Sequence, residues 1–145
     1  MPSLREGFIL YSGAVMSDIK THELDMVNNR ELPFLQYMER GIKKAEGRVA
    51  TPQVRGMKIG DRLYLKGVTE YGIFEITYLH FYPGFSEMLD GEGLKTMVPF
   101  VDSKEKALEI YMSFPGAEEV FEYGCCAIGI KHIETKLDFT VDDLS

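Results

Sequence analysis

The order of strand-like and helix-like segments constrains the fold of this 145-residue chain more than any other feature. Apolar residues recur at helical spacing in residues 29–40 and 103–114, which predicts one helix in each segment. Strands are predicted for residues 22–26, 46–50, 62–66, 73–81 and 125–132. Because the helices interrupt the strands instead of alternating with them, the pattern excludes a doubly wound parallel sheet. It predicts an α+β fold, a small mixed and mostly antiparallel β-barrel or curled sheet with peripheral helices.

Turn-forming and capping residues set the limits of these segments. Asn28 or Asn29 is expected to cap the first helix, and Asp102 is expected to cap the second. Residues 51–56, which include a Thr-Pro pair, are predicted as a loop. Residues 90–93 read Asp-Gly-Glu-Gly and are predicted as a turn.

Length and composition fit one ordinary globular domain that spans residues 1–145. Hydrophobic residues make up 45% of the chain and charged residues 27%, close to the average of globular domains. No apolar run approaches the roughly 20 residues that cross a bilayer, and residues 1–18 are not typical of a signal peptide. We therefore expect no membrane association and a cytoplasmic location, or a nuclear one in a cell that has a nucleus.

The cysteines and histidines do not indicate a metal site. Cys125 and Cys126 are adjacent, so on a strand their side chains point to opposite faces and do not form a disulfide with each other. No Cys/His spacing of a zinc site is present. Nothing in the sequence indicates a metal or an organic cofactor.

Charge is unevenly distributed along an acidic chain. Sixteen basic residues against 23 acidic ones give a net charge of −7, which argues against a surface that coats nucleic acid. Residues 40–66 hold eight basic and two acidic residues, a net charge of +6, so the rest of the chain carries −13. Such a basic segment indicates a local anionic ligand, such as a nucleotide or short RNA, or else a solvated strand pair balanced by nearby acids.

The segment Gly41–Arg48 holds the residues best placed for chemistry. Lys43 falls in the turn after the helix, whereas Glu46 and Arg48 are two apart on a strand and project from the same face. If that face borders a cleft, Glu46 orders two cations that can contact a phosphate or the polar edge of a base. Repulsion from Arg48 and partial burial would lower the pKa of Lys43, and Glu46 would oppose both. The alternative is a structural ion-pair cluster that joins helix to strand.

The pattern Gly41-x-Lys43-x-x-Glu46-x-Arg48 resembles the G-x-K-x-x-E-x-R signature of the ASCH domain family, whose fold is a PUA-like β-barrel. Other features follow in the order typical of that family. They are the Lys58-Ile59-Gly60-Asp61 turn, a long strand that ends in aromatic residues at 78–82, the Glu92-Gly93-Leu94 segment and a closing strand at 124–131. The resemblance covers about residues 21–134 and implies a PUA-like barrel.

The resemblance also implies a role connected with nucleic acid. ASCH domains are thought to bind RNA or RNA-derived ligands in a cleft lined by the motif residues. One small bacterial branch of the family hydrolyses acetylcytidine with the motif lysine, the residue three positions later and a distant glutamate. Carried over, these positions are Lys43, Glu46 and Glu92. That branch has threonine where this chain has Glu46, and a carboxylate there would pair with Lys43 and keep it protonated.

Further residues are candidates for the same cleft. Tyr82 ends a row of alternating aromatic residues on one strand face, where it is expected either to stack on a base or to belong to a half-buried sheet. Arg55 and Lys58, in the predicted loop after the motif, are candidates for contact with a phosphate backbone. His22 precedes the first helix and is a candidate for the same cleft.

Three functions remain open at this point. The first is the binding of RNA or a modified nucleoside or nucleotide in a basic cleft formed by the motif. The second is an amidohydrolase that removes an acyl group from acetylcytidine, with Lys43 as base or nucleophile, Glu92 orienting water and Arg48 stabilising the oxyanion. The third is a protein-interaction domain whose charge cluster is structural.

Overall fold

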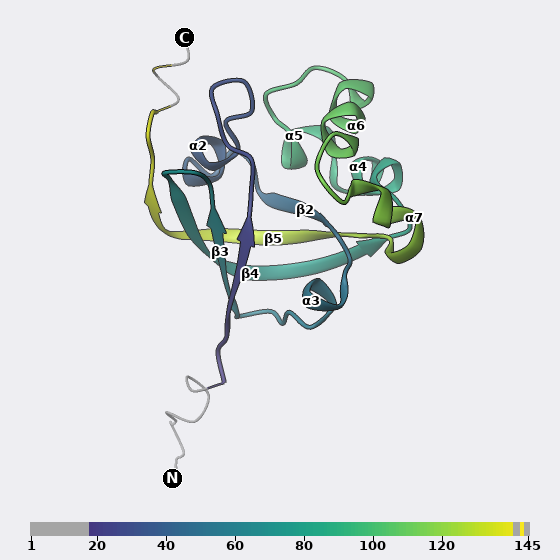
Figure 1. Ribbon diagram of the computed structural model, residues 1–145, viewed down its shortest axis with the longest axis horizontal. Coiled ribbons are helices and arrows are strands. Elements are labelled where there is room, and N and C mark those ends of the chain that lie inside the picture. Colours follow the sequence, from purple (N-terminus) through teal and green to yellow (C-terminus); the bar gives the residue numbers. More distant parts are fainter. Residues whose placement is uncertain (1–17, 141–142, 144–145) are drawn as a thin grey trace.

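A single mixed sheet organises the molecule in the computed structural model, which describes residues 18–140 and residue 143 (Figure 1). The strands are β1 (Thr21–Asp25), β2 (Ala45–Val49), β3 (Arg62–Lys66), β4 (Tyr71–Tyr82) and β5 (Cys125–Lys136). Their order in the sheet is β1-β3-β4-β5-β2. The β1–β3 pair is parallel, and the other three pairs are antiparallel. The predicted α+β class and mostly antiparallel sheet are therefore confirmed.

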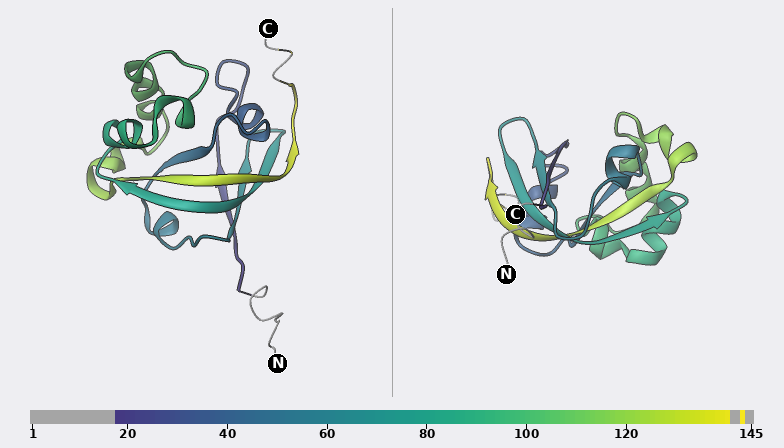
Figure 2. Two further views of the ribbon diagram at one scale, coloured as in Figure 1. Left: turned by 180° about the vertical axis from the view of Figure 1, so that it is seen from behind. Right: turned by 90° about the horizontal axis from the view of Figure 1, so that it is seen from below.

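The sheet does not close into the predicted barrel and has the alternative form, a curled sheet, because β1 and β2 form its two edges. The sheet is strongly curved, which brings these edges towards each other (Figure 2). Arg48 on β2 bridges them, because its Nη2 donates to the Asp25 carbonyl on β1 at 2.8 Å. Gln53, which follows β2 in the chain, donates from Nε2 to the Glu23 carbonyl on β1 at 3.3 Å. The two edge strands are thus linked by side chains and not by strand pairing.

Short helical segments cover the sheet. In chain order they are α2 (Phe34–Glu39), α3 (Pro52–Arg55), α4 (Phe85–Glu92), α5 (Leu94–Met97), α6 (Lys104–Met112), the 3-10 helix η2 (Ala117–Glu119) and α7 (Val120–Tyr123). The segments α4 to α7 gather over one end of the sheet, and α2 lies towards the other end (Figure 1). Within the described residues, no helix has the length and apolar character that a membrane span requires.

The core lies between these helices and the sheet. Leu63 and Leu65 on β3 are fully buried, as their alternation in the sequence predicts. Phe74 and Ile76 on β4 and Ile128 on β5 are fully buried as well. Both cysteines are buried and free.

The first helix is shorter than the predicted span 29–40. Asn29 Oδ1 accepts hydrogen bonds from the amides of residues 31 and 32, which holds this stretch in a turn before α2 begins. Asn28 Oδ1 accepts from the amide of Leu35 at 2.8 Å. The two asparagines therefore satisfy amides before and within the first turn, although neither occupies the position directly before the helix.

The segment predicted as a loop at 51–56 contains the helix α3. Thr51 Oγ1 accepts from the amide of Val54 at 3.4 Å, and Pro52 occupies the first helical position. Threonine followed by proline is a helix start as well as a loop signal, because proline lacks the amide that the first turn leaves unpaired. Sequence pattern alone did not separate these two interpretations.

Two further expectations are also wrong. Residues 90–92 do not form a turn, because they complete α4, and the chain turns only at Gly93, whose φ is +96°. The cap of α6 is Ser103, whose Oγ accepts from the amide of Lys106 at 3.2 Å, and not Asp102. Serine and aspartate are comparable caps, so the two adjacent residues could not be ranked from sequence.

We predict that Gly129→Ala lowers the free energy of unfolding by about 1–3 kcal/mol, the range typical of overpacking. The Tyr78 ring lies directly over Gly129 where β4 and β5 shift register, and a Cβ at Gly129 would overlap ring carbons. Gly56→Ala is the control, because a Cβ there has its nearest neighbours at 3.5 Å. Chemical denaturation measures both, and equal stability of the two variants would contradict the close packing.

Candidate functional site

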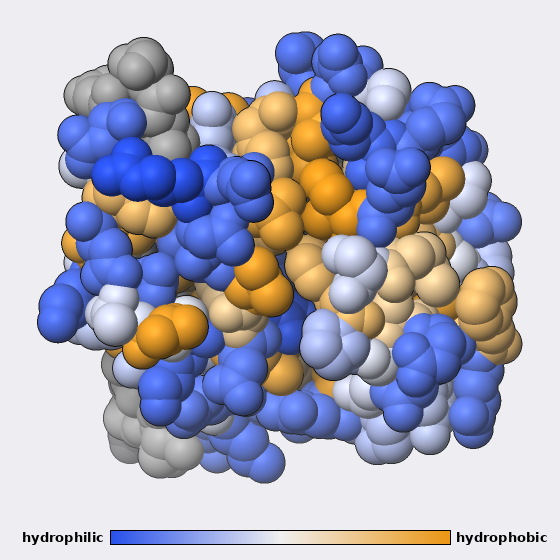
Figure 3. Space-filling model, turned by 45° about the horizontal axis from the view of Figure 1, so that its top comes forward, coloured by the Kyte–Doolittle hydropathy of each residue, from blue (hydrophilic) through white to orange (hydrophobic). Residues whose placement is uncertain are grey.

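A cavity of about 540 Å³ lies beside the gap between the sheet edges. Its walls come from β2 with Lys43 before it, from the end of β1 with the residues that follow it, and from α2, α3, α4, α6 and residues 114–119. Aromatic side chains from the helical side line it, namely Phe34, Phe85, Tyr111 and Phe114. The space-filling view shows apolar surface along the middle of this face, between hydrophilic flanks (Figure 3). The volume is within the range of small-molecule sites.

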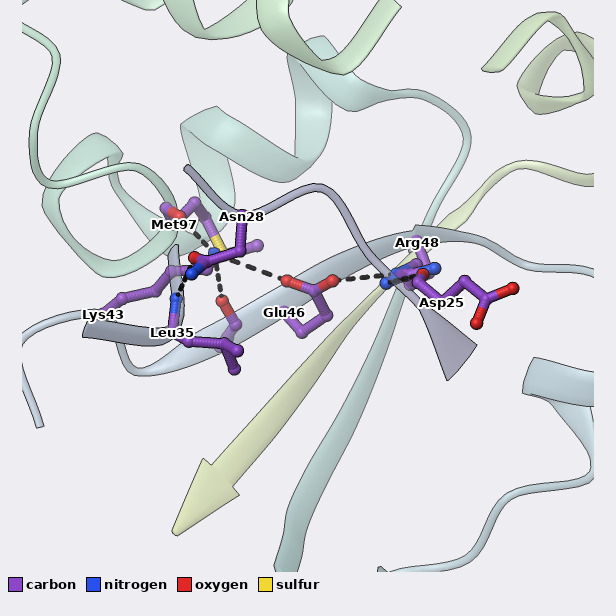
Figure 4. Close-up of polar contacts among 8 residues, drawn as sticks. Asp25, Asn28, Leu35, Lys43, Glu46, Arg48 and Met97 are labelled. Atoms are coloured by element: carbon purple, nitrogen blue, oxygen red, sulfur yellow. Dashed lines mark hydrogen bonds and ion pairs between the residues drawn. The ribbon is translucent and has the colours of Figure 1, made fainter. Parts of the chain in front are cut away.

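Lys43 lies in the wall of this cavity but is almost entirely buried, with 1% of its surface exposed. Its Nζ donates to the carbonyl of Ala45 at 2.6 Å and to the carbonyl of Met97, and it lies 3.8 Å from Glu46 Oε1 (Figure 4). The ammonium is also 5.5 Å from the centre of the Phe34 ring. Lys43 therefore joins the start of β2 to the end of α5.

Burial lowers the pKa of Lys43 to about 8, because the charged ammonium loses its hydration. The carboxylate of Glu46 raises this pKa, and the guanidinium of Arg48 lowers it. These are the influences that the motif spacing predicts. The result is an amine whose protonation changes near neutral pH while it stays inside the protein.

Glu46 and Arg48 project from the same face of β2, as their spacing predicts. Arg48 Nε donates to Glu46 Oε2 at 2.8 Å, while the other oxygen of Glu46 faces Lys43 (Figure 4). Glu46 is 7% exposed, and the Arg48 side chain is 24% exposed. Lys43, Glu46 and Arg48 thus form a continuous ion-pair chain along the wall of the cavity, which we call the motif triad.

The cavity is not the basic cleft that the charge distribution predicts. The charged residues among its described lining are Asp25, Lys43, Glu46, Arg48 and Glu119, two basic and three acidic. At neutral pH their formal charges nearly cancel. The lining therefore favours a ligand that is close to neutral over one with several phosphates.

Tyr111 on α6 is a lining residue that sequence reasoning did not assign to the site. Its hydroxyl is buried and has no hydrogen-bond partner among the described residues. Burial raises the pKa of this phenol well above its ordinary value, and the charge of Glu46 raises it further. Its ring stacks on Phe85 with centroids 4.9 Å apart and planes inclined by 11°. The apolar periodicity of the helix indicates only that residue 111 faces the core.

Glu92 and Tyr82 lie together but do not line this cavity. The carboxylate of Glu92 accepts hydrogen bonds from the hydroxyls of Tyr78, at 3.0 Å, and Tyr82, and His80 Nδ1 lies 2.8 Å from it. Burial alone would raise the pKa of Glu92, but these hydrogen bonds outweigh it and lower the pKa. The hydrogen bond to Glu92 is the largest contribution that raises the pKa of Tyr82 to about 12. We call these four residues the Glu92 cluster.

The remaining predicted ligand residues also lie away from the cavity lining. His22 Nε2 is 2.8 Å from Asp61 Oδ2, in a contact between β1 and the turn before β3. Arg55 donates to two backbone carbonyls at 3.1 and 2.8 Å. The amide of Lys58 donates to Asp61 at 3.1 Å, within the same turn. In the described part of the chain, no three His, Cys, Asp or Glu side chains are grouped so that they could hold a metal ion.

Comparisons with known proteins place the fold but assign no activity. No protein-family model and no curated protein matches the chain. The crystal structure of hypothetical protein PH0355 matches with a TM-score of 0.66 and 29% identity, over 77% of this chain and 100% of that one. The solution NMR structure of protein PF0455 from Pyrococcus furiosus matches with a TM-score of 0.60 and 32% identity, over 78% of this chain and 99% of that one. At this identity and coverage, the chain belongs to the same family as the Pyrococcus furiosus protein.

We predict that Lys43 makes the protein more stable as pH rises from about 8 to about 10.5. In that window the unfolded chain, with the ordinary pKa of 10.5, binds more protons at Lys43 than the folded one does. The free energy of unfolding therefore rises with pH, by an amount on the order of 3 kcal/mol over the whole window. The measurement is the free energy of unfolding of wild type and of Lys43→Met at each pH. The difference between the two proteins cancels the contribution of the other titrating groups, because both proteins contain them.

The matched control for this measurement is Lys44→Met, at the exposed neighbouring lysine. Its difference from wild type is expected to stay constant between pH 7.5 and 9.5. A Lys43→Met difference that is equally flat would show that Lys43 titrates at its ordinary pKa.

Proposed function

We propose that this protein binds RNA or a modified nucleoside, with one base or nucleoside held in the cavity beside the motif triad. The observation that carries the proposal is the cavity itself, in which aromatic walls face the ion-pair chain of Lys43, Glu46 and Arg48. Aromatic side chains suit the flat face of a base, and charged donors and acceptors suit its polar edge.

The near balance of charge in the cavity favours a nucleoside over a long stretch of RNA. Each neutralised phosphate needs an accessible cation, and here Lys43 is buried while Arg48 is paired with Glu46. The chain as a whole carries a net charge of −7, which opposes an extended polyanion. A single neutral heterocycle, free or at the end of an RNA strand, fits these charges better.

The resemblance to the ASCH domain family supports this proposal. The three charged residues of the signature are not adjacent in the sequence, but their side chains form one connected chain of ion pairs beside the cavity (Figure 4). The small mixed sheet with peripheral helices is compatible with an open relative of a PUA-like fold. Membership of that family, like the ligand, is part of the proposal.

A second candidate function is hydrolysis of an acylated cytidine. The observation that favours it is the pKa of about 8 at Lys43, since an amine near neutrality can remove a proton from water. The neutral amine of Lys43 would take a proton from water, and the water oxygen would attack the acyl carbon. The Lys43 ammonium would then give that proton to the leaving nitrogen as the amide bond breaks, which releases the neutral amino group of cytidine and acetic acid, and the acid ionises to acetate. Because Glu92 is outside the cavity, this version of the reaction depends on the motif triad alone.

The third candidate, a structural charge cluster, is favoured by the two backbone carbonyls that Lys43 already satisfies. Unlike the other two candidates, a purely structural cluster does not account for the open cavity beside it, which aromatic residues line.

We predict that acetylcytidine or cytidine binds the protein and that Glu46→Gln weakens this binding at least tenfold. The substitution keeps the shape of the side chain but removes the charge that orders Arg48, and a charge-assisted hydrogen bond contributes about 1.5–3 kcal/mol. Calorimetric titration of nucleosides and of a short RNA measures the affinity. Glu109→Gln, at an exposed glutamate on α6, is the control and should bind as wild type does.

Chromatography of the same mixtures separates binding from hydrolysis. Release of acetate from acetylcytidine by wild type, but not by Lys43→Met, would establish the second candidate. The absence of binding by every nucleoside and by the RNA would contradict the first two candidates and leave the structural one.

A further inference from the structure

The edge strand β2 turns the backbone groups of alternate residues towards the open side of the sheet. In an antiparallel pair, every second residue exchanges hydrogen bonds with the partner strand, and the residues between them point their N–H and C=O groups the other way. The amide of Ala50 donates to the Gly124 carbonyl at 2.9 Å, and the amide of Ile130 donates to the Lys44 carbonyl at 3.2 Å. Gly47 lies three positions from each of these β2-side residues, and the register between them has no shift. Its N–H and C=O therefore point away from β5.

Gly47 is the position on this free edge that keeps both backbone groups available. On the same edge, the Ala45 carbonyl accepts from Lys43 Nζ at 2.6 Å. The Val49 carbonyl accepts from the amide of Thr51 at 2.9 Å. In the part of the chain that the structure describes, no residue off the sheet donates to the Gly47 carbonyl or accepts from its amide. The free edge therefore offers one donor and one acceptor on a single residue.

These two groups lie at the cavity beside the motif triad. Gly47 is buried and lines the cavity, and Leu24 and Asp25 of the edge strand β1 line it from the other side. One face of Gly47 is covered, because a Cβ there would lie 2.8 Å from atoms of Met88 and Tyr111. Because β1 and β2 are not paired, the edge itself is the direction from which a ligand reaches the Gly47 backbone.

The length of the free edge limits what can bind there. A peptide that adds a strand to a sheet needs donors and acceptors along several residues. Here the carbonyls two residues before and after Gly47 already have partners. Arg48 also crosses from β2 to the Asp25 carbonyl, in the path of an added strand. A small ligand with one acceptor beside one N–H donor matches this edge better than an extended peptide does.

We propose that the backbone of Gly47 recognises the edge of a planar ligand, with its N–H donating to a ring acceptor and its C=O accepting from an adjacent N–H. This inference rests on the proposed function, because it places the nucleoside in the same cavity. In cytidine, the ring nitrogen N3 and the neighbouring exocyclic amino group form such a pair. Both contacts come from neutral backbone groups, which suits a ligand that is close to neutral.

The inference makes the site selective for the ligand edge. A site that hydrogen-bonds its ligand in this way rejects analogues that lack the matching group, because its own polar groups are then left unpaired. The cytidine analogue with hydrogen in place of the exocyclic amino group keeps the acceptor and loses the donor. In calorimetric titrations we expect it to bind at least about tenfold more weakly than cytidine.

Amide hydrogen exchange measured by NMR tests the contact at the backbone itself. Glu46 and Arg48 are the matched controls, because they flank Gly47 on the same strand and their amides are paired with β5. Without ligand, we expect the Gly47 amide to exchange faster than both. With saturating cytidine or acetylcytidine, we expect its exchange to slow at least about tenfold relative to the two controls.

Four results would overturn the inference. A Gly47 amide that is as protected as its neighbours without ligand already has a partner in the protein. If a nucleoside binds but the relative exchange of Gly47 does not change, the inference fails while the proposed function stands. Equal affinity for cytidine and for the analogue without the amino group has the same meaning. If wild type binds neither cytidine nor acetylcytidine, the proposed function and this inference both fail.

Discussion

The buried ammonium of Lys43 is the interaction on which the rest of the site depends. Two backbone carbonyls accept its hydrogen bonds, one at the start of β2 and one at the end of α5, so this side chain joins α5 to the sheet edge. A buried charge is tolerated only when it is paired and hydrogen-bonded. Glu46 supplies the counter-charge, and Arg48 in turn holds Glu46 and reaches across to β1. The cavity lies beside this chain of contacts and takes its shape from them.

The open side of the sheet and the site lie together. Arg48 on the edge strand β2 donates to the carbonyl of Asp25 on the other edge strand, β1, and both residues line the cavity. A side-chain hydrogen bond thus links the two edges, which are not paired as strands.

The sequence predicted the local part of the site better than its surroundings. The spacing of Glu46 and Arg48 requires a shared strand face, and the structure shows that face. Residues brought together by tertiary packing, such as Tyr111, left no local signal, because a tyrosine on the apolar side of a helix looks like any core residue. The strands were recovered well, since alternation is a strong signal. The short helices α3, α4, α5 and α7 were not predicted. In α3 and α4, the Pro and Gly residues also mark loops.

The basic run in residues 40–66 shows why charge counted along a chain misleads. The Arg55 side chain donates to backbone carbonyls, Lys58 does not line the cavity, and of the basic residues in this run only Lys43 and Arg48 do. Asp25 and Glu119, from distant parts of the sequence, then reverse the balance there. Residues 40–66 carry a net charge of +6 in the sequence, but the cavity lining to which they contribute has more acidic than basic groups. Selectivity in such a lining comes from the direction of individual donors and acceptors, so a ligand is distinguished by the pattern on its edge and not by its total charge.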